Sequence, residues 1–346
     1  MIEIKNLNKT YDNKNKALKN INIHIEQGEF VFIMGRSGSG KSTLMKILLK
    51  EVEPTSGQVI VNDMELGKMP RRYVPKYRKM LGVVFQDFRL LKHMTVYENV
   101  AFAQRVLGLP VRKIKENVPA MLRQVGLSSK YKSYPDQLSG GEQQRVALCR
   151  CIVTKPKVLL MDEPFSAIDA KLRKALQKRI KEIHRELGMT TIFVTHDQDE
   201  AMSMSDTIHL MNRGIVEQSA RPLELYAHPK TAFAASFMGN YNMMTAEQFR
   251  SVTGDQWRRD VCIRPELIEI FGDSVEDLEQ RKEGYTLSGT VTERIPQGNT
   301  VLYYVTVSNL QFKVSRLFNS PAFFEEGQKV CLFIPRDAVL QYEKET

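Results

Sequence analysis

Three short apolar runs in the first 240 positions end abruptly in glycine or polar residues. Residues 30–34 pass through the glycine-rich segment 35–42 into residues 43–49, whose apolar positions recur at helical spacing. The runs 158–161 and 191–194 end in polar residues, and a charged amphipathic stretch separates them. Apolar strands separated by helices predict an α/β fold with a largely parallel sheet and helices on its faces. Polar groups at the carboxyl ends of such strands gather into one site.

The pattern changes near residue 240, where helical spacing largely disappears. Short β-like runs follow a polar stretch, at residues 261–270, 285–294, 300–307, 310–314 and 329–334. The length of 346 residues suits two domains. We therefore expect a large α/β domain over residues 1–238, a linker over 239–260 and a small β domain of barrel or sandwich type over 261–346.

The composition favours anionic partners and a reducing compartment. The formal net charge is +10, and the densest basic stretch is residues 68–79. A solvated face is the commonest explanation of such a stretch, and contact with lipid headgroups or RNA is the alternative. No apolar run approaches the roughly 20 residues of a spanning helix, the N-terminus has no signal core, and the four cysteines are expected to be reduced, buried thiols. We expect a cytoplasmic chain, held at a membrane by partners if it acts there.

The segment from Gly35 to Ser42 fits the phosphate-loop pattern G-x-x-x-x-G-K-[ST]. Glycines let backbone amides surround an anion, and the following helix points its positive end at it. Lys41 is expected to reach the β- and γ-phosphates and Ser42 to bind Mg²⁺. An ordinary glycine turn before a helix is the alternative. It would explain the glycines, but not why a lysine and a serine occur at the spacing that the phosphate loop requires. The nucleotide-binding residues predicted from this segment are Gly35, Ser37, Gly38, Gly40, Lys41, Ser42 and Thr43.

Two acids, Asp162 and Glu163, follow the apolar run 158–161. A carboxylate at a strand end is costly unless it binds a cation or an amide, so Asp162 suits Mg²⁺. Glu163 is predicted to orient or deprotonate the water that attacks the γ-phosphate. The alternative for the pair, a helix or turn cap, ranks far behind because the phosphate loop precedes it.

Residues 138–145 read Leu-Ser-Gly-Gly-Glu-Gln-Gln-Arg and resemble the signature motif of ATP-binding-cassette ATPases. The resemblance extends over residues 1–240 and implies that Ser139, Gly140, Gly141 and Gln143 bind the ATP that is held by the phosphate loop of another protomer. A capping box between Ser139 and Glu142 is the structural alternative, and both can hold because the cap aims the helix amides.

The same resemblance assigns four further residues. Tyr11 is similar to the aromatic residue that stacks on adenine, with a core or edge-strand tyrosine as a serious alternative. Gln86 resembles the glutamine that meets Mg²⁺ and water. Asp169 resembles a residue of the loop that crosses the dimer interface, and His196 resembles the histidine that contacts the γ-phosphate.

Several segments resemble the importer ATPases for polyamines, iron, sulfate and sugars, which carry a C-terminal TOBE-type, OB-like β-barrel. They are residues 169–173, 224–229, 237–240 and 263–266. Residues 81–91 and 95–100, by contrast, resemble the cell-division ATPase of the same superfamily, which usually lacks the barrel. An importer is therefore favoured, a division-type regulator is the alternative, and a nucleic-acid or ribosome-associated ATPase ranks low.

The importer resemblance implies a phosphate-loop ATPase cassette with a helical subdomain at about residues 87–155. It implies ATP and Mg²⁺ as cofactors and a head-to-tail pair, either a homodimer or a pairing with a second cassette ATPase. It further implies transmembrane permease subunits, an extracytoplasmic solute-binding protein and a place on the cytoplasmic face of the membrane, without direct nucleic-acid binding. The solute is not expected to be readable here, because the partners select it.

Overall fold

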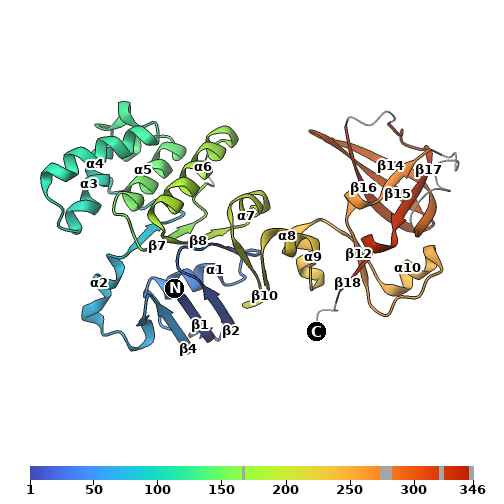
Figure 1. Ribbon diagram of the computed structural model, residues 1–346, viewed down its shortest axis with the longest axis horizontal. Coiled ribbons are helices and arrows are strands. Elements are labelled where there is room, and N and C mark those ends of the chain that lie inside the picture. The colour runs from blue at the N-terminus through green and yellow to red at the C-terminus, as the bar shows by residue number, and fades with distance from the viewer. Residues whose placement is uncertain (166–167, 273–282, 319–322, 343–346) are drawn as a thin grey trace. The chain divides into compact units, whose positions relative to one another are not determined.

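The computed structural model describes residues 1–165, 168–272, 283–318 and 323–342. Contacts divide the chain into two compact units, Met1–Leu223 and Glu224–Thr346 (Figure 1). Within the described ranges, every helix is too short or too polar to cross a lipid bilayer. The four cysteines, Cys149, Cys151, Cys262 and Cys331, are buried thiols, as expected.

A six-stranded sheet forms the centre of the first unit, in the order β10-β9-β3-β8-β7-β6. Five of its strands are parallel, and β10 pairs antiparallel with β9. The expected α/β arrangement is therefore present. The strands are β3 Phe30–Met34, β6 Leu81–Val84, β7 Val158–Asp162, β8 Thr190–Thr195, β9 Thr207–Asn212 and β10 Ile215–Ala220, and the helices connected to them are α1 Lys41–Leu48, α6 Ala170–Leu187 and α7 Gln198–Met204.

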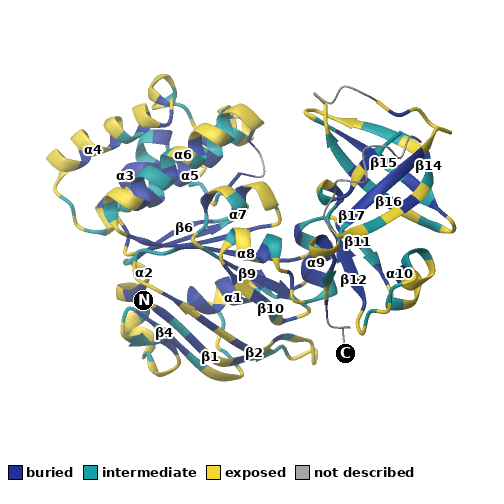
Figure 2. Ribbon diagram, turned by 45° about the vertical axis from the view of Figure 1, so that its right-hand side comes forward, coloured by how far each residue is buried: buried dark blue, intermediate teal, exposed yellow. Residues whose placement is uncertain are grey.

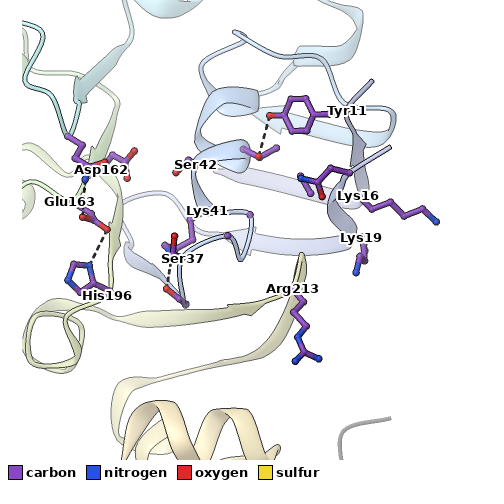
Figure 3. A pocket seen from close by; sticks show the side chains of 17 residues that line it. Tyr11, Lys16, Lys19, Ser37, Lys41, Ser42, Asp162, Glu163, His196 and Arg213 are labelled. Carbon is purple, nitrogen blue, oxygen red and sulfur yellow. Dashed lines mark hydrogen bonds and ion pairs between the residues drawn. The ribbon is translucent and has the colours of Figure 1, made fainter. Parts of the chain in front are cut away.

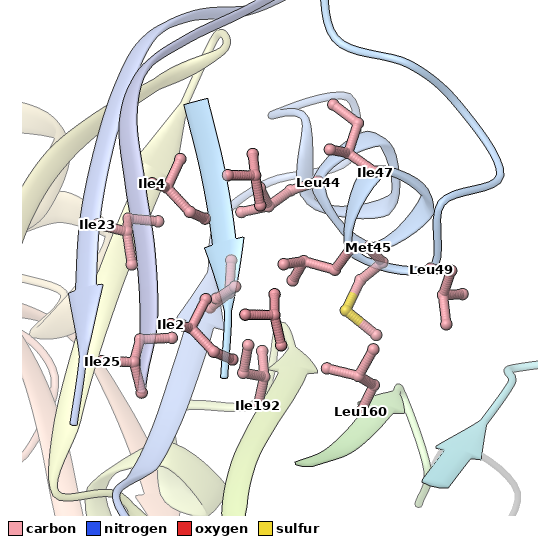
Figure 4. Close-up of a cluster of buried hydrophobic side chains, with 14 of the residues drawn as sticks. Ile2, Ile4, Ile23, Ile25, Leu44, Met45, Ile47, Leu49, Leu160 and Ile192 are labelled. Atoms are coloured by element: carbon pink, nitrogen blue, oxygen red, sulfur yellow. The ribbon is translucent and has the colours of Figure 1, made fainter. Parts of the chain in front are cut away.

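A smaller antiparallel sheet, in the order β2-β1-β4-β5, covers α1. Its strands are β1 Ile2–Thr10, β2 Lys16–Ile25, β4 Ser56–Val61 and β5 Met64–Glu65. Alternating isoleucines of β1 and β2 are buried, because side chains of a strand alternate between its two faces. Together with the apolar face of α1 they form the main core of the unit, shown in Figure 4.

Three helices with a core of their own form the helical part of this unit (Figure 1). They are α3 Val96–Val106, α4 Val111–Gln124 and α5 Gly140–Ile152, and they lie within the range 87–155 that the sequence predicts to be helical. A short helix, α2 Val74–Arg78, precedes β6. The short 3-10 helices of the unit are η1 Leu66–Lys68, η2 Arg71–Tyr73, η3 Ser128–Lys130 and η4 Pro135–Gln137.

The second unit contains a five-stranded antiparallel sheet, β13-β17-β14-β15-β16, and a three-stranded sheet, β11-β12-β18. The predicted small β domain is therefore present. The strands are β11 Asn242–Met244, β12 Val261–Ile263, β13 Glu269–Phe271, β14 Gly284–Gln297, β15 Thr300–Val307, β16 Leu310–Leu317, β17 Lys329–Pro335 and β18 Leu340–Gln341. The helices are α8 Pro222–Ala227, which begins two residues before the unit, α9 Ala232–Met238, α10 Ala246–Thr253, η5 Pro265–Leu267 and η7 Arg336–Ala338.

The structure differs from the prediction of a linker at residues 239–260, because β11 and α10 lie there. A capping box between Thr245 and Gln248 starts α10, and Phe249 is fully buried in the core of the β domain. The division between the units also falls before the expected boundary near residue 240. Ala235 of α9 packs with Tyr241 of the second unit, which attaches α9 to that unit.

Candidate functional site

The glycine loop between β3 and α1 has backbone angles that side chains disfavour. Gly35 and Gly40 have φ values of 148° and 106°, and a Cβ atom at Gly35 would collide with the carbonyl of Met211. Gly40 is also the N-cap of α1 and supplies no side chain to the first-turn amides. Those amides remain available to an anion, which the positive end of the helix would attract.

Lys41 is buried beneath this loop. Its ammonium group donates to the carbonyl oxygens of Gly35 and Arg36, at 2.7 and 3.0 Å. Burial lowers the pKa of Lys41, while the carboxylates of Glu163 and Asp162 act against that shift. A phosphate group beside the loop would therefore meet a partly desolvated cation, which strengthens their attraction.

A cavity of about 700 Å³ extends from the glycine loop towards the ends of β7 and β8. It brings together twelve of the residues predicted from the sequence, although they come from distant segments (Figure 3). Those residues are Tyr11, Gly35, Ser37, Gly38, Gly40, Lys41, Ser42, Thr43, Gln86, Asp162, Glu163 and His196.

Glu163 lies at the acidic end of the cavity with a positive φ of 46°, which is uncommon for a residue with a side chain. Its Oε1 lies 3.1 Å from Nδ1 of His196, and its Oε2 accepts a hydrogen bond from Nε2 of Gln86 at 3.4 Å. Two residues that the sequence assigns to catalysis, Gln86 and His196, are therefore each hydrogen-bonded to the carboxylate of the third, Glu163.

Asp162 is half-buried beside Lys41 and Ser42 in the same cavity. Burial raises the pKa of Asp162, the neighbouring Glu163 raises it further, and Lys41 opposes the shift. Its carboxylate accepts no hydrogen bond from any residue that the structure describes. A desolvated carboxylate without a donor is well suited to a divalent cation, because the cation would repay the cost of burial.

Tyr11 lies at the opposite end of the cavity and is half-buried. Its hydroxyl group is 3.3 Å from the hydroxyl oxygen of Thr43, and the ammonium of Lys9 lies 5.1 Å from its ring centroid. The ring therefore belongs to the cavity wall, at the end remote from Glu163 (Figure 3).

The structure adds three cations to the cavity wall that the sequence analysis did not identify: Lys16, Lys19 and Arg213. Lys16 and Lys19 belong to β2, and Arg213 occupies the turn between β9 and β10. Two backbone hydrogen bonds hold this turn, from Gly214 to Ser39 and from Lys19 to Gly214. These residues form no local motif, so only the tertiary fold reveals their proximity to the phosphate loop.

The signature residues do not line this cavity. Ser139 caps α5 by accepting a hydrogen bond from the amide of Glu142, whose carboxylate accepts one from the amide of Ser139. Gln143 donates to the carbonyls of Pro135 and Leu138. Ser139 and Gly140 are exposed and Gly141 is half-exposed. The predicted cap geometry is present, and it presents the start of α5 to solvent.

Asp169 is also exposed and lies outside the cavity. It is the N-cap of α6, where its Oδ1 accepts a hydrogen bond from the amide of Leu172 at 3.0 Å. Residues 166–167 precede it and lie outside the described part of the chain. The residues predicted to lie at the dimer interface are therefore accessible to solvent, and they lie at the starts of two helices: Ser139 to Gly141 at α5 and Asp169 at α6.

Comparison with known proteins places this geometry in a family. The ABC transporter family model matches residues 18–166, and the TOBE domain model matches residues 261–340. A spermidine/putrescine import ATP-binding protein of Borreliella afzelii is 37% identical, with 100% of this chain and 99% of the relative covered. The chain is an import ATPase of the ATP-binding-cassette family. A protein of the same name from Clostridium acetobutylicum is 40% identical, with 89% of this chain and 88% of that protein covered.

Solved structures support the fold of this import ATPase. The dimeric ATP-binding cassette MJ0796, bound to ADP and phosphate, is 33% identical with a TM-score of 0.61, and the match covers 64% of this chain and 99% of that one. The structure of cbiO1 from Clostridium perfringens is 32% identical with a TM-score of 0.60, covering 65% and 90%. The predicted cassette fold, the TOBE domain, the ATPase activity and the importer branch are confirmed, and the cell-division alternative is not supported.

Proposed function

We propose that the import ATPase binds ATP with Mg²⁺ in the cavity between Tyr11 and Glu163. Three features that line this one cavity support the proposal: the phosphate loop, the desolvated carboxylate of Asp162 and the carboxylate of Glu163, which is hydrogen-bonded to His196. Lys41 and the first-turn amides of α1 hold the β- and γ-phosphates. The adenine stacks on Tyr11, and Thr43 contacts the α-phosphate.

Ser42, Asp162 and Gln86 are proposed to serve the Mg²⁺ ion. Water and the phosphates of the nucleotide would supply further ligands, because Mg²⁺ usually keeps several waters and binds through one or two carboxylates and substrate phosphates. The ion supplies neutralisation of charge on the phosphates. Glu163 orients the attacking water, and His196, held by Glu163, contacts the γ-phosphate.

The proposed active unit is a head-to-tail pair of cassettes. Ser139 and Gly140 are exposed and Gly141 is half-exposed, and all three lie outside the cavity of their own chain, so they are available to complete the site of a partner. Each ATP then lies between Lys41 of one protomer and the start of α5 of the other, with Gln143 and Asp169 at the interface. Hydrolysis removes the group that joins the protomers and lets them part.

Substitution of Glu163 by Gln tests this assignment. The variant should still bind ATP and Mg²⁺, but it should hydrolyse ATP at least 100-fold more slowly than the wild type, as measured by phosphate release. It should also accumulate as a stable dimer in size-exclusion chromatography. Glu116→Gln, which alters an exposed carboxylate on α4, is the matched control and should behave like the wild type. Rapid turnover by Glu163→Gln would exclude Glu163 as the group that orients water.

The proposed substrate class is the polyamines, since full-length relatives are named spermidine/putrescine import ATP-binding proteins. The chain would act at the cytoplasmic face of the membrane, together with permease subunits and an extracytoplasmic solute-binding protein. Members of this importer family work as dimers with such permeases.

Purification of the complex from native membranes tests the partners, and its reconstitution tests the solute. Mass spectrometry should find multi-span permeases and a solute-binding protein, and spermidine should stimulate ATP hydrolysis in liposomes while maltose and sulfate should not. Stimulation by maltose or sulfate alone would replace the polyamine assignment. A partner with few spans and a large extracytoplasmic domain, in place of these proteins, would contradict the proposed set of partners.

A further inference from the structure

A strip of exposed cations runs along η2 and α2, apart from the residues that line the nucleotide cavity. We define the basic strip as Arg71, Arg72, Lys76 and Lys79, all of which are exposed. Arg72, Lys76 and Lys79 are spaced by four and three residues, and such spacing places side chains on one face of a helix. Figure 2 colours much of the segment around α2 as exposed.

The opposite face of the segment is fixed to the core. Tyr77 is 1% exposed and donates its hydroxyl hydrogen to the carbonyl of Leu48. Arg78 donates to the carbonyls of Leu49 and Lys50 at the end of α1. The basic strip is therefore displayed on a firmly anchored base, and Arg78 is excluded from it because its guanidinium group is already engaged.

The charge of the basic strip is not compensated by any carboxylate that the structure describes. No Asp or Glu occurs between Glu65 and Asp87. Among the described residues, none pairs with any of the four cations, whereas the nearby Lys68 forms an ion pair with Glu65 at 2.7 Å. Four exposed positive charges, three of them on one face of this segment, therefore remain available to an anionic partner.

We propose that the basic strip binds the anionic phosphate headgroups of a lipid membrane. Four cations are the number at which clusters of Lys and Arg begin to bind anionic membranes. Within the described part of the chain, their long side chains have no hydrogen-bond partner to orient them, which suits a fluid array of headgroups better than a fixed site. Tyr73, 47% exposed beside the strip, has the amphipathic ring that favours the membrane interface.

Single-stranded RNA is a poorer match for the same charges. RNA binding without sequence preference relies on aromatic faces on which bases stack. The basic strip has one exposed ring, Tyr73, and the guanidinium group of Arg72 lies 5.2 Å from its centroid. The geometry therefore favours a membrane surface, and the proposal rests on the proposed function at a membrane permease.

Vesicle flotation of the full-length chain tests this inference without the permease. The vesicles contain phosphatidylglycerol and phosphatidylcholine in equal amounts, or phosphatidylcholine alone. Each cation near an anionic surface should strengthen binding about fivefold, so the combined variant Arg71→Gln, Arg72→Gln, Lys76→Gln and Lys79→Gln should bind on the order of several hundredfold more weakly. Binding of the wild type should also fall at 0.5 M NaCl, because salt screens exposed charges.

A control variant neutralises four exposed cations of α4, namely Arg112, Lys113, Lys115 and Arg123, and should retain vesicle binding within about 20-fold. Equal binding to both vesicle types, or equal loss in the two quadruple variants, would overturn the inference. So would RNA binding that depends on the strip while vesicles remain unbound. ATP hydrolysis and thermal unfolding are measured for each variant. Lost vesicle binding with unchanged hydrolysis and melting temperature concerns the basic strip alone, whereas lost hydrolysis or a lower melting temperature indicates a failure of the ATPase assignment or of folding.

Discussion

Tyr11 shows how a single residue can be interpreted in two ways until its surroundings are known. In the sequence it is either an adenine platform or a tyrosine of the core. In the structure it is half-buried in the cavity wall and lies beside Thr43. The position supports the first interpretation, and the role stays a prediction.

Replacement of Tyr11 by Ala and by Phe distinguishes the two roles. Stacking of a base on an aromatic ring is worth about 1–3 kcal/mol, so Tyr11→Ala should raise the KM for ATP by about tenfold or more with little change in kcat. Tyr11→Phe keeps the ring and should stay within about threefold of the wild type. If Tyr11 is a core residue, the Ala variant will instead lower the melting temperature while KM is unchanged.

Glu200 provides a prediction about pH. It is 4% exposed, accepts a hydrogen bond from Thr195 at 2.9 Å, and burial raises its pKa to about 6 from 4.5. As pH rises, the unfolded chain loses this proton first, so the free energy of unfolding falls between about pH 4.5 and pH 6 and remains lower above. The ionised carboxylate thus costs about 2 kcal/mol at pH 8.

Glu200→Gln should therefore stabilise the chain at pH 8 by up to about 2 kcal/mol, and the gain should shrink towards pH 4.5. Urea unfolding at several pH values measures it, with Glu116→Gln as the exposed control. A gain that is independent of pH would show that titration of Glu200 is not its cause.

The sequence predicts those residues of the cavity that belong to a local motif. Lys41 and Ser42 follow from the spacing of the phosphate loop, and Glu163 follows from an apolar strand that ends in acids. Arg213 could not be predicted, because only the pairing of β9 with β3 brings its turn to the phosphate loop. Side chains without a motif depend on contacts between segments that are distant in the sequence.

At the scale of elements, α5 has both a structural and a proposed catalytic role at the same residue. Ser139 closes a capping box, and its proposed partner is the ATP of another chain. The same box occurs at the start of α3, between Thr95 and Glu98. The two helices therefore allow the two roles to be separated by experiment.

Ser139→Ala and Thr95→Ala should each lower the free energy of unfolding by about 1 kcal/mol, the usual cost of a lost cap. Ser139→Ala should in addition reduce kcat at least tenfold, whereas Thr95→Ala should leave it within twofold. Chemical unfolding and phosphate release provide the two readouts. An equal loss of kcat in both variants would mean that the cap alone affects activity.

Elements with a strong apolar period were predicted, and those made of polar residues were not. The strands β3, β7 and β8 are apolar runs, so the sequence indicates them directly. Helix α10 has one fully buried side chain, Phe249, and its polar composition resembles a linker. The spacing of Thr245 and Gln248 was the signal that could have identified its start.

For the whole molecule, the position of α9 explains why the expected boundary near residue 240 differs from the division that the contacts give. Its sequence, like that of the preceding α8, continues the family pattern of the first 240 residues. Packing of Ala235 with Tyr241 and Cys262 nevertheless assigns it to the second unit. Cys262 comes more than 20 residues after Ala235, so a local pattern does not reveal this packing.

The two units have separate buried cores and should unfold in two calorimetric transitions. A ligand stabilises the part that binds it, by about 2.7 kcal/mol at a concentration 100 times its Kd. Addition of ATP and Mg²⁺ should therefore raise only the transition of the cassette. Scanning calorimetry of the full chain measures both transitions, and one cooperative transition that ATP shifts as a whole would contradict the expectation.

The burial of all four thiols has a practical consequence for observing the pair of cassettes. Burial raises the pKa of Cys151 to about 11 and that of Cys262 to about 12, and it raises the pKa of Cys149 as well. Thiolates are the reactive form, so these side chains should take up little maleimide dye at neutral pH. A cysteine introduced at an exposed position such as Ser128→Cys or Ser129→Cys should therefore carry the fluorophore almost alone. Energy transfer between two labelled protomers could then follow closure and opening in the otherwise native chain.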